Sequence, residues 1–220
     1  MSSLHGIFFQ PPLEDNWLGH IVGEIYKDRV YDPLLRGKSN LTILDIGANI
    51  GVFSYFASQF AQKIYSLEPS LEHFQVLTHM INHNKLDHIV EPINKAIYIK
   101  NGRFEFGGPQ NNRTMRSLHM ATWQDGKPDE VVAAVTLEDL FEEKKIDHVD
   151  FMKLDIEGSE AEVLASESFR NVAPKIDTIL MELHSWTGRH PNQVKEALKN
   201  AGFTVSTVPN DAEILVAKRK

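Results

Sequence analysis

Hydrophobic residues follow two patterns along the chain. Short apolar runs, bounded by glycine, proline or acidic residues, alternate with longer stretches in which apolar residues recur every three or four positions. The short runs predict strands at 41–46, 63–67, 89–93, 149–154 and 177–183, and the longer stretches predict helices at 50–61, 70–84, 159–165 and 191–201. Strands that alternate with helices imply parallel pairing, so we expect an α/β fold with a mostly parallel, doubly wound sheet.

Antiparallel pairing is expected at two places. Residues 203–208 and 213–217 flank a Pro-Asn-Asp-Ala turn, which predicts a C-terminal antiparallel hairpin. Residues 96–100 and 103–106 flank the dipeptide Asn101-Gly102, which favours a second hairpin. Between these regions, Thr136 and the acids that follow it resemble the capped start of a helix.

Two segments lie outside this alternation. Residues 1–40 are expected to form a helical cap, because apolar residues recur at helical spacing after a plausible N-cap, Asp15: Trp17, Leu18, Ile21, Val22, Ile25 and Tyr26. Such a helix suits core cover, closure of a ligand pocket, or both. Residues 107–130 predict a long loop. The loop either binds a polar substrate or is a surface loop without a function. The residues that suit a polar substrate are Arg113, Arg116, Ser117, His119 and Trp123.

Composition narrows the class of protein. The 220 residues are 42% hydrophobic and 24% charged, which is typical of one globular domain. The chain has no cysteine, which excludes disulfides, thiolate metal sites and cysteine nucleophiles. No apolar run is long enough for a membrane span and no secretory signal is evident, so we expect a cytoplasmic protein without a membrane partner. The net charge of −7 argues against nucleic acid as a partner.

The turn after the first strand predicts a nucleoside-cofactor pocket. Asp45 ends the strand, Gly47 and Gly51 follow it, and the next strand ends at Glu68, an acid placed to bind ribose hydroxyls. A dinucleotide site would carry a third glycine where Asn49 stands, and Asp45 would repel a pyrophosphate. A carboxylate attracts the ammonium group of an amino acid. The turn therefore favours S-adenosylmethionine over NAD, and an NAD-dependent oxidoreductase is a weaker alternative.

Together with Asn94-Lys-Ala-Ile97 and Lys153-Leu-Asp-Ile-Glu-Gly-Ser-Glu160, the segments Asp45-Ile-Gly-Ala-Asn-Ile-Gly51 and Glu68-Pro69 resemble the FkbM family of S-adenosylmethionine-dependent methyltransferases. The resemblance implies a Rossmann-like class I methyltransferase domain over residues 41–220. Its implied cofactor-binding residues are Asp45, Gly47, Ala48, Asn49, Gly51, Glu68, Asn94, Ala96 and Asp155. Asp45 would orient the glycine turn or reach the cofactor's amino group, and Asn94 and Ala96 would lie near adenine.

Candidate catalytic residues fall at the carboxyl ends of later strands, where ligands bind in open α/β sheets: Asp155, Glu157, Glu182 and His184. Lys153 and Asp155 share a strand face, either as a buried ion pair that holds the structure or with Lys153 tuning Asp155. His184 has a suitable unperturbed pKa for the base that takes the acceptor's proton, with Asp155 or Glu157 as competitors.

The resemblance implies a hydroxyl acceptor on a sugar or small metabolite. Alternatives are methylation of nitrogen or of a macromolecule, or a cofactor-binding relative without turnover. Asp155, Glu182 and His184 have the chemistry of metal ligands, but no ligand-spacing motif supports a metal, so none is predicted. His79 and His83, four residues apart, more simply form a solvated helix face. The acceptor and the oligomeric state are not specified by the sequence.

Overall fold

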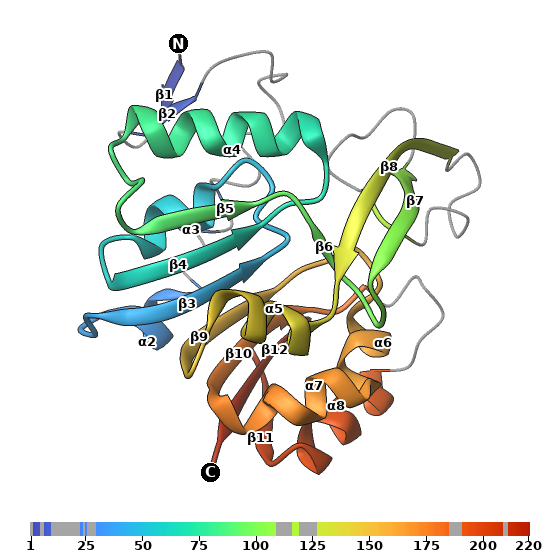
Figure 1. Ribbon diagram of the computed structural model, residues 1–220. Coiled ribbons are helices and arrows are strands. Elements are labelled where there is room, and N and C mark those ends of the chain that lie inside the picture. Colours follow the sequence, from blue (N-terminus) through green and yellow to red (C-terminus); the bar gives the residue numbers. More distant parts are fainter. Residues whose placement is uncertain are drawn as a thin grey trace.

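The computed structural model describes residues 2–4, 7–9, 23, 25, 30–108, 116–118, 127–184, 191–208 and 211–220 (Figure 1). Its centre is a seven-stranded sheet of order β11-β12-β10-β9-β3-β4-β5. The strands are β3 (Leu41–Ile46), β4 (Ala61–Leu67), β5 (Val90–Ile93), β9 (Val149–Leu154), β10 (Ile176–Glu182), β11 (Phe203–Val208) and β12 (Asp211–Arg219). The expected strands are therefore all present, with small shifts at their ends.

Strand pairing confirms the predicted fold class. The strands β10, β9, β3, β4 and β5 pair in parallel, and β12 pairs antiparallel with both β10 and β11. The chain winds outward from β3 to β5 and then returns to β9 on the other side of β3. The order therefore reverses between β3 and β9, and ligands of open α/β sheets bind at the carboxyl ends of the strands at such a point.

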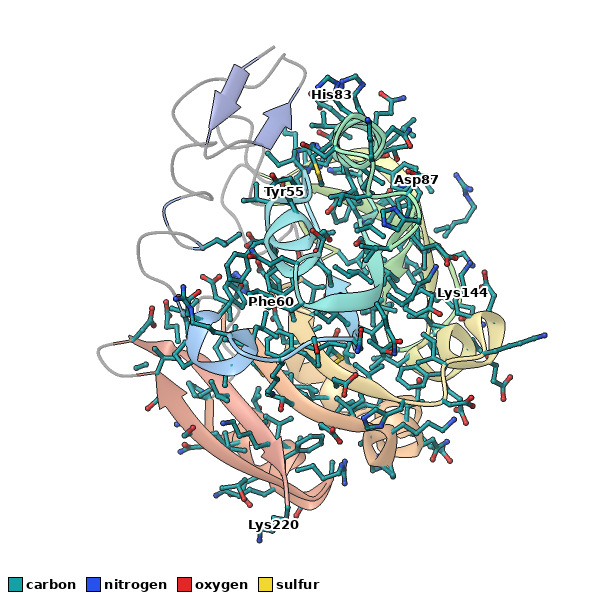
Figure 2. The ribbon with its side chains drawn as sticks, turned by 90° about the vertical axis from the view of Figure 1, so that its left-hand side faces the viewer. Tyr55, Phe60, His83, Asp87, Lys144 and Lys220 are labelled. Atoms are coloured by element: carbon teal, nitrogen blue, oxygen red, sulfur yellow. The ribbon has the colours of Figure 1, made fainter. Side chains whose placement is uncertain are left out.

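Helices cover both faces of the sheet. One face packs against α2 (Asp32–Leu35), α3 (Val52–Ala57) and α4 (Leu71–His83), and the other packs against α5 (Leu137–Lys144), α6 (Glu160–Ala165), α7 (Glu167–Val172) and α8 (Pro191–Asn200). The side-chain view places Tyr55 of α3 and Lys144 of α5 on opposite sides of the sheet (Figure 2). Both faces of the central strands are thus buried, as their apolar sequences predict.

Helix α3 is shorter than the predicted helix 50–61. Gly51 adopts a left-handed backbone at its N-cap, and Ala61 already begins β4. Besides a separate three-stranded sheet, the other described elements are a short hairpin of β1 (Ser2–Leu4) and β2 (Ile7–Phe9) and the 3-10 turn η2 (Ala173–Lys175). None of the helices in these described parts of the chain is long and apolar enough to span a membrane.

The predicted hairpin around Asn101-Gly102 is wrong. Strand β6 (Ala96–Ile97) pairs in parallel with β8 (Lys127–Val135), and β8 also pairs antiparallel with β7 (Gly102–Gly108), so the strands before and after the dipeptide do not pair with each other. Asn101 instead accepts a hydrogen bond from Thr136 N at 3.0 Å and donates one to Asp139 Oδ2 at 2.8 Å. These bonds attach the turn to the start of α5 rather than to a two-residue hairpin.

The irregular segment is also shorter than the predicted 107–130. Strand β7 extends to Gly108, β8 begins at Lys127, and Ser117 forms an isolated bridge with Gly107. Arg113, His119 and Trp123 lie outside the described residues. So do Asp15 and every apolar residue of the expected N-terminal helix except Ile25, which is helical and buried.

The Thr136 cap of α5 provides a test of local stability. Its Oγ1 accepts a hydrogen bond from Asp139 N at 3.1 Å, as the sequence predicts. We expect Thr136→Ala to reduce the free energy of unfolding by about 1 kcal/mol, because one backbone N–H at the helix start loses its partner. Ser70, the N-cap of α4, makes no side-chain cap bond and is the control. Urea unfolding should show a smaller loss for Ser70→Ala; equal losses would contradict the cap's contribution.

Candidate active site

A cavity opens between the carboxyl ends of the central strands and the small sheet β6-β8-β7, which stands beyond the arrowheads of β3 and β4 in Figure 1. Together with open solvent at its mouth, the space between its walls amounts to about 590 Å³. Its walls are formed by residues after β3, β4 and β9 and by residues of the small sheet: Ile46, Gly47, Asn49, Leu67, Glu68, Pro69, His73, Lys95, Ala96, Ile97, Phe106, Arg116, Leu118, Asp155, Ile156, Glu157 and Ser159. This is the position expected from the strand order.

The glycine turn after β3 is held against both neighbouring strands. Gly47 N and Ala48 N donate to Leu67 O of β4, and Gly47 has a positive φ of 80°. A Cβ on Gly47 would lie 1.7 Å from the carbonyl oxygen of Asp155. A Cβ on Gly51 would meet Leu77 and Met80 of α4. Close packing therefore requires glycine at both positions, in addition to the ligand clearance expected from the sequence.

Asp45 lies beneath the turn and not on the cavity wall. Its side chain is fully buried, accepts a hydrogen bond from Ser54 Oγ at 2.5 Å, and lies 4.0 Å from Lys153 Nζ. Ser54 also bonds to Ser66 Oγ of β4. Burial raises the pKa of Asp45, and the Lys153 ammonium and the Ser54 bond lower it in part. Asp45 thus joins β3 to α3 beneath the glycine turn.

Glu68 extends from the end of β4 along the cavity wall. Its Oε2 accepts from Asn49 N at 2.9 Å and its Oε1 accepts from Ser70 N at 2.9 Å. Asn49 adopts a positive φ of 51° in the turn, which brings its amide to the carboxylate. Burial raises the pKa of Glu68 to about 7 against the lowering effect of both backbone bonds. Each carboxylate oxygen retains acceptor capacity for a ligand hydroxyl.

Asn94 supports this wall without lining it. Its Nδ2 donates to the carbonyl oxygens of Glu68 and Pro69, each at 2.9 Å, and so fixes the chain after β4. Ala96, in β6, lies on the cavity wall. The two residues expected near adenine are thus one supporting residue and one lining residue.

Lys153 joins the glycine turn to the end of β9. Its Nζ donates to Gly47 O at 3.0 Å and to Asp155 Oδ2 at 3.0 Å, and its side chain is 9% exposed. Burial acts to lower the pKa of Lys153, but Asp155, Tyr31 and Asp45 raise it above its usual value. Burial likewise acts to raise the pKa of Asp155, and Lys153 and His184 bring it below its usual range. Both groups are therefore held in their charged forms.

His184 and the carboxylates around it form a second group of charged side chains behind Asp155. His184 Nδ1 donates to Glu160 Oε1 at 2.8 Å, and its Nε2 lies 3.3 Å from Glu157 Oε2 and 3.8 Å from Asp155 Oδ1. Burial acts to lower the pKa of His184, but Glu160, Glu157 and Asp155 raise it to about 10. Burial raises the pKa of Glu157 to about 8, His184 lowers it, and the other carboxylates, including Glu182, add to the rise. His184 is therefore a cationic side chain among several carboxylates.

Comparison with known proteins identifies the family. The family model for the methyltransferase FkbM domain matches residues 45–205, which is most of the chain. The chain belongs to the FkbM methyltransferase family. This confirms the resemblance drawn from the Asp45–Gly51 and Lys153–Glu160 segments.

Relatives of this FkbM chain are distant. Hexuronic acid methyltransferase AglP of Haloferax volcanii is 21% identical over 178 residues, which cover 80% of this chain and 70% of that protein. The crystal structure of methyltransferase FkbM from Methylobacillus flagellatus KT has a TM-score of 0.61 at 14% identity and covers 90% of this chain. The chain spans only 47% of that structure. Magnesium protoporphyrin IX methyltransferase of Synechocystis PCC 6803, solved with bound SAM, has a TM-score of 0.55 at 14% identity, over 96% of this chain and 86% of its own. These structures establish a class I methyltransferase fold.

The FkbM fold brings the predicted site residues to one edge of the sheet, in two groups. Six of them line the cavity: Gly47, Asn49, Glu68, Ala96, Asp155 and Glu157. The others support the wall or lie behind it: Asp45, Ala48, Gly51, Asn94, Glu182 and His184.

Several lining residues of the FkbM site were not assigned to it from the sequence. Phe106 and Leu118 come from the small sheet and its loop, whose pairing was not predicted. Arg116, noted only as a polar loop residue, stacks over Phe106 at 5.2 Å and binds Asp129 through both terminal nitrogens. Lys95 directly follows Asn94, and this position after a strand was the signal that could have identified it.

Proposed function

We propose that this chain is an S-adenosylmethionine-dependent O-methyltransferase that acts on a hydroxyl group of a sugar or small metabolite. The observation that carries the proposal is the convergence of Glu68, which follows β4, and of Asp155 and Glu157, which follow β9, on one cavity. Such a cavity offers carboxylates at separate positions for a ligand with both hydroxyl groups and a cationic amino acid end.

The lining residues fit the cofactor. Glu68 would accept hydrogen bonds from the ribose hydroxyls, because each of its oxygens already binds one backbone amide and can accept another donor. Gly47 and Asn49 would hold the methionine part with Ala48 buried behind them, and Ala96 and Ile97 would lie against adenine. When bound, S-adenosylmethionine supplies an electrophilic sulfonium methyl, which passes to the acceptor oxygen and leaves a neutral thioether.

The remaining chemistry is the removal of the acceptor's proton and the alignment of its oxygen. Glu157 is the better-placed base, because it lines the cavity and its buried Oε2 lies against His184 Nε2 at 3.3 Å, which leaves the other carboxylate oxygen for the acceptor's proton. Asp155 Oδ2 already accepts from Lys153. His184 and Glu182 do not line the cavity, so we assign them a positioning role in place of the base expected at His184.

Support for a sugar acceptor comes from the relative named as a hexuronic acid methyltransferase. The first experiment is calorimetric titration of the full chain with S-adenosylmethionine, S-adenosylhomocysteine and NAD. Binding of both adenosyl ligands without NAD is expected, and NAD binding alone would overturn the proposal. Incubation with hexuronic acids and the matching neutral hexoses should then yield a product that has gained a methyl group in mass spectra.

We expect Glu68→Gln to weaken S-adenosylmethionine binding at least tenfold, because the amide cannot accept at both positions. The pKa of Glu68, raised to about 7, adds a pH test. As the pH falls through that value the carboxylate is protonated and becomes a poorer acceptor, so wild-type affinity should fall. Calorimetry at pH 6, 7 and 8 should show this slope in the wild type and in the control Glu105→Gln, an exposed position, but not in Glu68→Gln. A slope that persists in Glu68→Gln would contradict the assignment.

A further inference from the structure

Metal-ligand side chains meet at the ends of β9 and β10. Asp155 follows β9, Glu182 ends β10, and His184 lies just beyond it. Each offers one ligand atom, and these atoms all lie within 4.8 Å of one another. Because β9 and β10 are neighbouring parallel strands, this grouping is not visible as a spacing motif in the sequence. That explains why the sequence favoured no metal.

The orientation of His184 is set from outside this group. Its Nδ1–H donates to Glu160 Oε1 at 2.8 Å, and Glu160 is itself fixed by the backbone N–H groups of Ile156 and Gly158. The ring thereby presents Nε2 toward Asp155 Oδ1, at 3.8 Å. A carboxylate that binds the far nitrogen of a histidine and fixes its tautomer is a regular feature of metal-bound histidines.

Charge and an orphaned oxygen point to the same place. Glu157 Oε2 is buried, has no hydrogen-bond partner among the described residues, and lies 3.3 Å from His184 Nε2. Lys153 binds only the other oxygen of Asp155, Oδ2. Carboxylate oxygens of Glu157 and Asp155 therefore border Nε2, and a cation that takes the place of the Nε2 proton would compensate their charge.

We propose that Asp155, Glu182 and His184 bind a divalent cation that accepts mixed oxygen and nitrogen ligands, such as Mn²⁺. Of these three residues Asp155 alone lines the cavity, so the acceptor would meet the cation at the part of the wall that Asp155 forms. This metal site rests on the proposed function and specifies the class of acceptor. The acceptor would be a sugar with neighbouring hydroxyls, or a hydroxyl next to a carboxylate, whose two oxygens chelate the cation. The bound hydroxyl is made more acidic and gives its proton to Glu157, its oxygen forms the bond to the methyl carbon, and the carbon–sulfur bond breaks with its electron pair on sulfur.

The chain offers a matched control site. His148, Asp150 and Asp177 also place ligand atoms within 4.8 Å of one another, at the opposite ends of β9 and β10. These side chains are more exposed, and His148 Nε2 already bonds to Asp177 Oδ2 at 3.2 Å. Without a buried carboxylate to orient the imidazole, we expect no tight binding there.

The test is Mn²⁺ titration of the full, chelator-treated chain without cofactor, with free Mn²⁺ measured by electron paramagnetic resonance. We expect one bound Mn²⁺ per chain, affinity reduced at least tenfold in His184→Gln and in Glu182→Gln, and unchanged affinity in His148→Gln. His184→Gln and Glu182→Gln, here called the inner variants, change different residues of the proposed site. One of them therefore remains informative if the other fails to fold. Circular dichroism identifies a misfolded variant.

Absence of Mn²⁺ binding to the wild type would overturn the proposal, as would binding that is lost in His148→Gln or retained in both inner variants. Parallel calorimetry with S-adenosylmethionine separates this outcome from failure of the proposed function. A chain that binds the cofactor but not Mn²⁺ refutes the metal site alone. A chain that binds Mn²⁺ but not the cofactor refutes the proposed function and leaves the metal site supported.

Discussion

Gly47→Ala is expected to lower the free energy of unfolding by about 3–5 kcal/mol and to abolish cofactor binding. The added Cβ would lie 1.7 Å from Asp155 O and 2.8 Å from Asp155 C, so the contact is with backbone that cannot rotate away. Either the glycine turn or the chain after β9 must move. Both carry lining residues of the cavity, so binding is lost together with stability.

A substitution at Gly37 is the control that distinguishes the steric contact at Gly47 from the cost of a left-handed backbone. The φ of Gly37, 82°, is close to the 80° of Gly47, but a Cβ at Gly37 would meet nothing within 4 Å. Gly37→Ala should therefore cost only the left-handed strain, about 1–2 kcal/mol, and keep cofactor binding. Urea unfolding and calorimetry of both variants give the comparison. Equal losses of stability, or retained binding in Gly47→Ala, would show that the contact with Asp155 does not hold the site.

Local pattern was sufficient for the sheet because burial on both faces gives each central strand an apolar sequence. Residues 41–46 and 149–154 form β3 and β9 at the predicted positions. The hairpin predicted at Asn101-Gly102 is wrong because strand pairing there is decided by a residue segment far away in the sequence. A hairpin there depends on which strand is available, and β8, distant in sequence, takes the place between β6 and β7. No local signal records that competition.

The same distinction applies to the site. Glu68, Asp155 and Glu157 follow strands, so topology alone carried them to the cavity. Phe106 and Leu118 reach the cavity only because the small sheet stands over the strand ends, and a sequence pattern cannot place that sheet. The grouping of Glu182 and His184 with Asp155, by contrast, was expected from their places at strand ends, and it arises because β9 and β10 are neighbours.

Lys153→Met is expected to lower the free energy of unfolding by about 3–5 kcal/mol at neutral pH, because it removes one partner of a buried ion pair. Lys153 Nζ binds Gly47 O and Asp155 Oδ2 and lies 4.0 Å from Asp45 Oδ1, an oxygen without a hydrogen-bond partner in the described residues. Lys63 provides the control, since its pair with Glu91 at 2.7 Å is about one-third exposed on each side. Lys63→Met should cost less than about 1 kcal/mol.

The loss in Lys153→Met should also depend on pH in a defined direction. Burial already raises the pKa of Asp45 and Lys153 opposes that rise, while Ser54 donates to Asp45 and Asp155 adds negative charge nearby. Without the ammonium, the pKa of Asp45 rises further. At pH values above that pKa, the charged and buried carboxylate lowers the stability of the folded state. The deficit is therefore largest at high pH and shrinks as acid protonates Asp45. Urea unfolding of wild type and variant at pH 5, 6.5 and 8 measures it. A deficit that stays constant across this range, or matches that of Lys63→Met, would mean that Lys153 stabilises the turn through its bond to Gly47 O and not through the buried carboxylates.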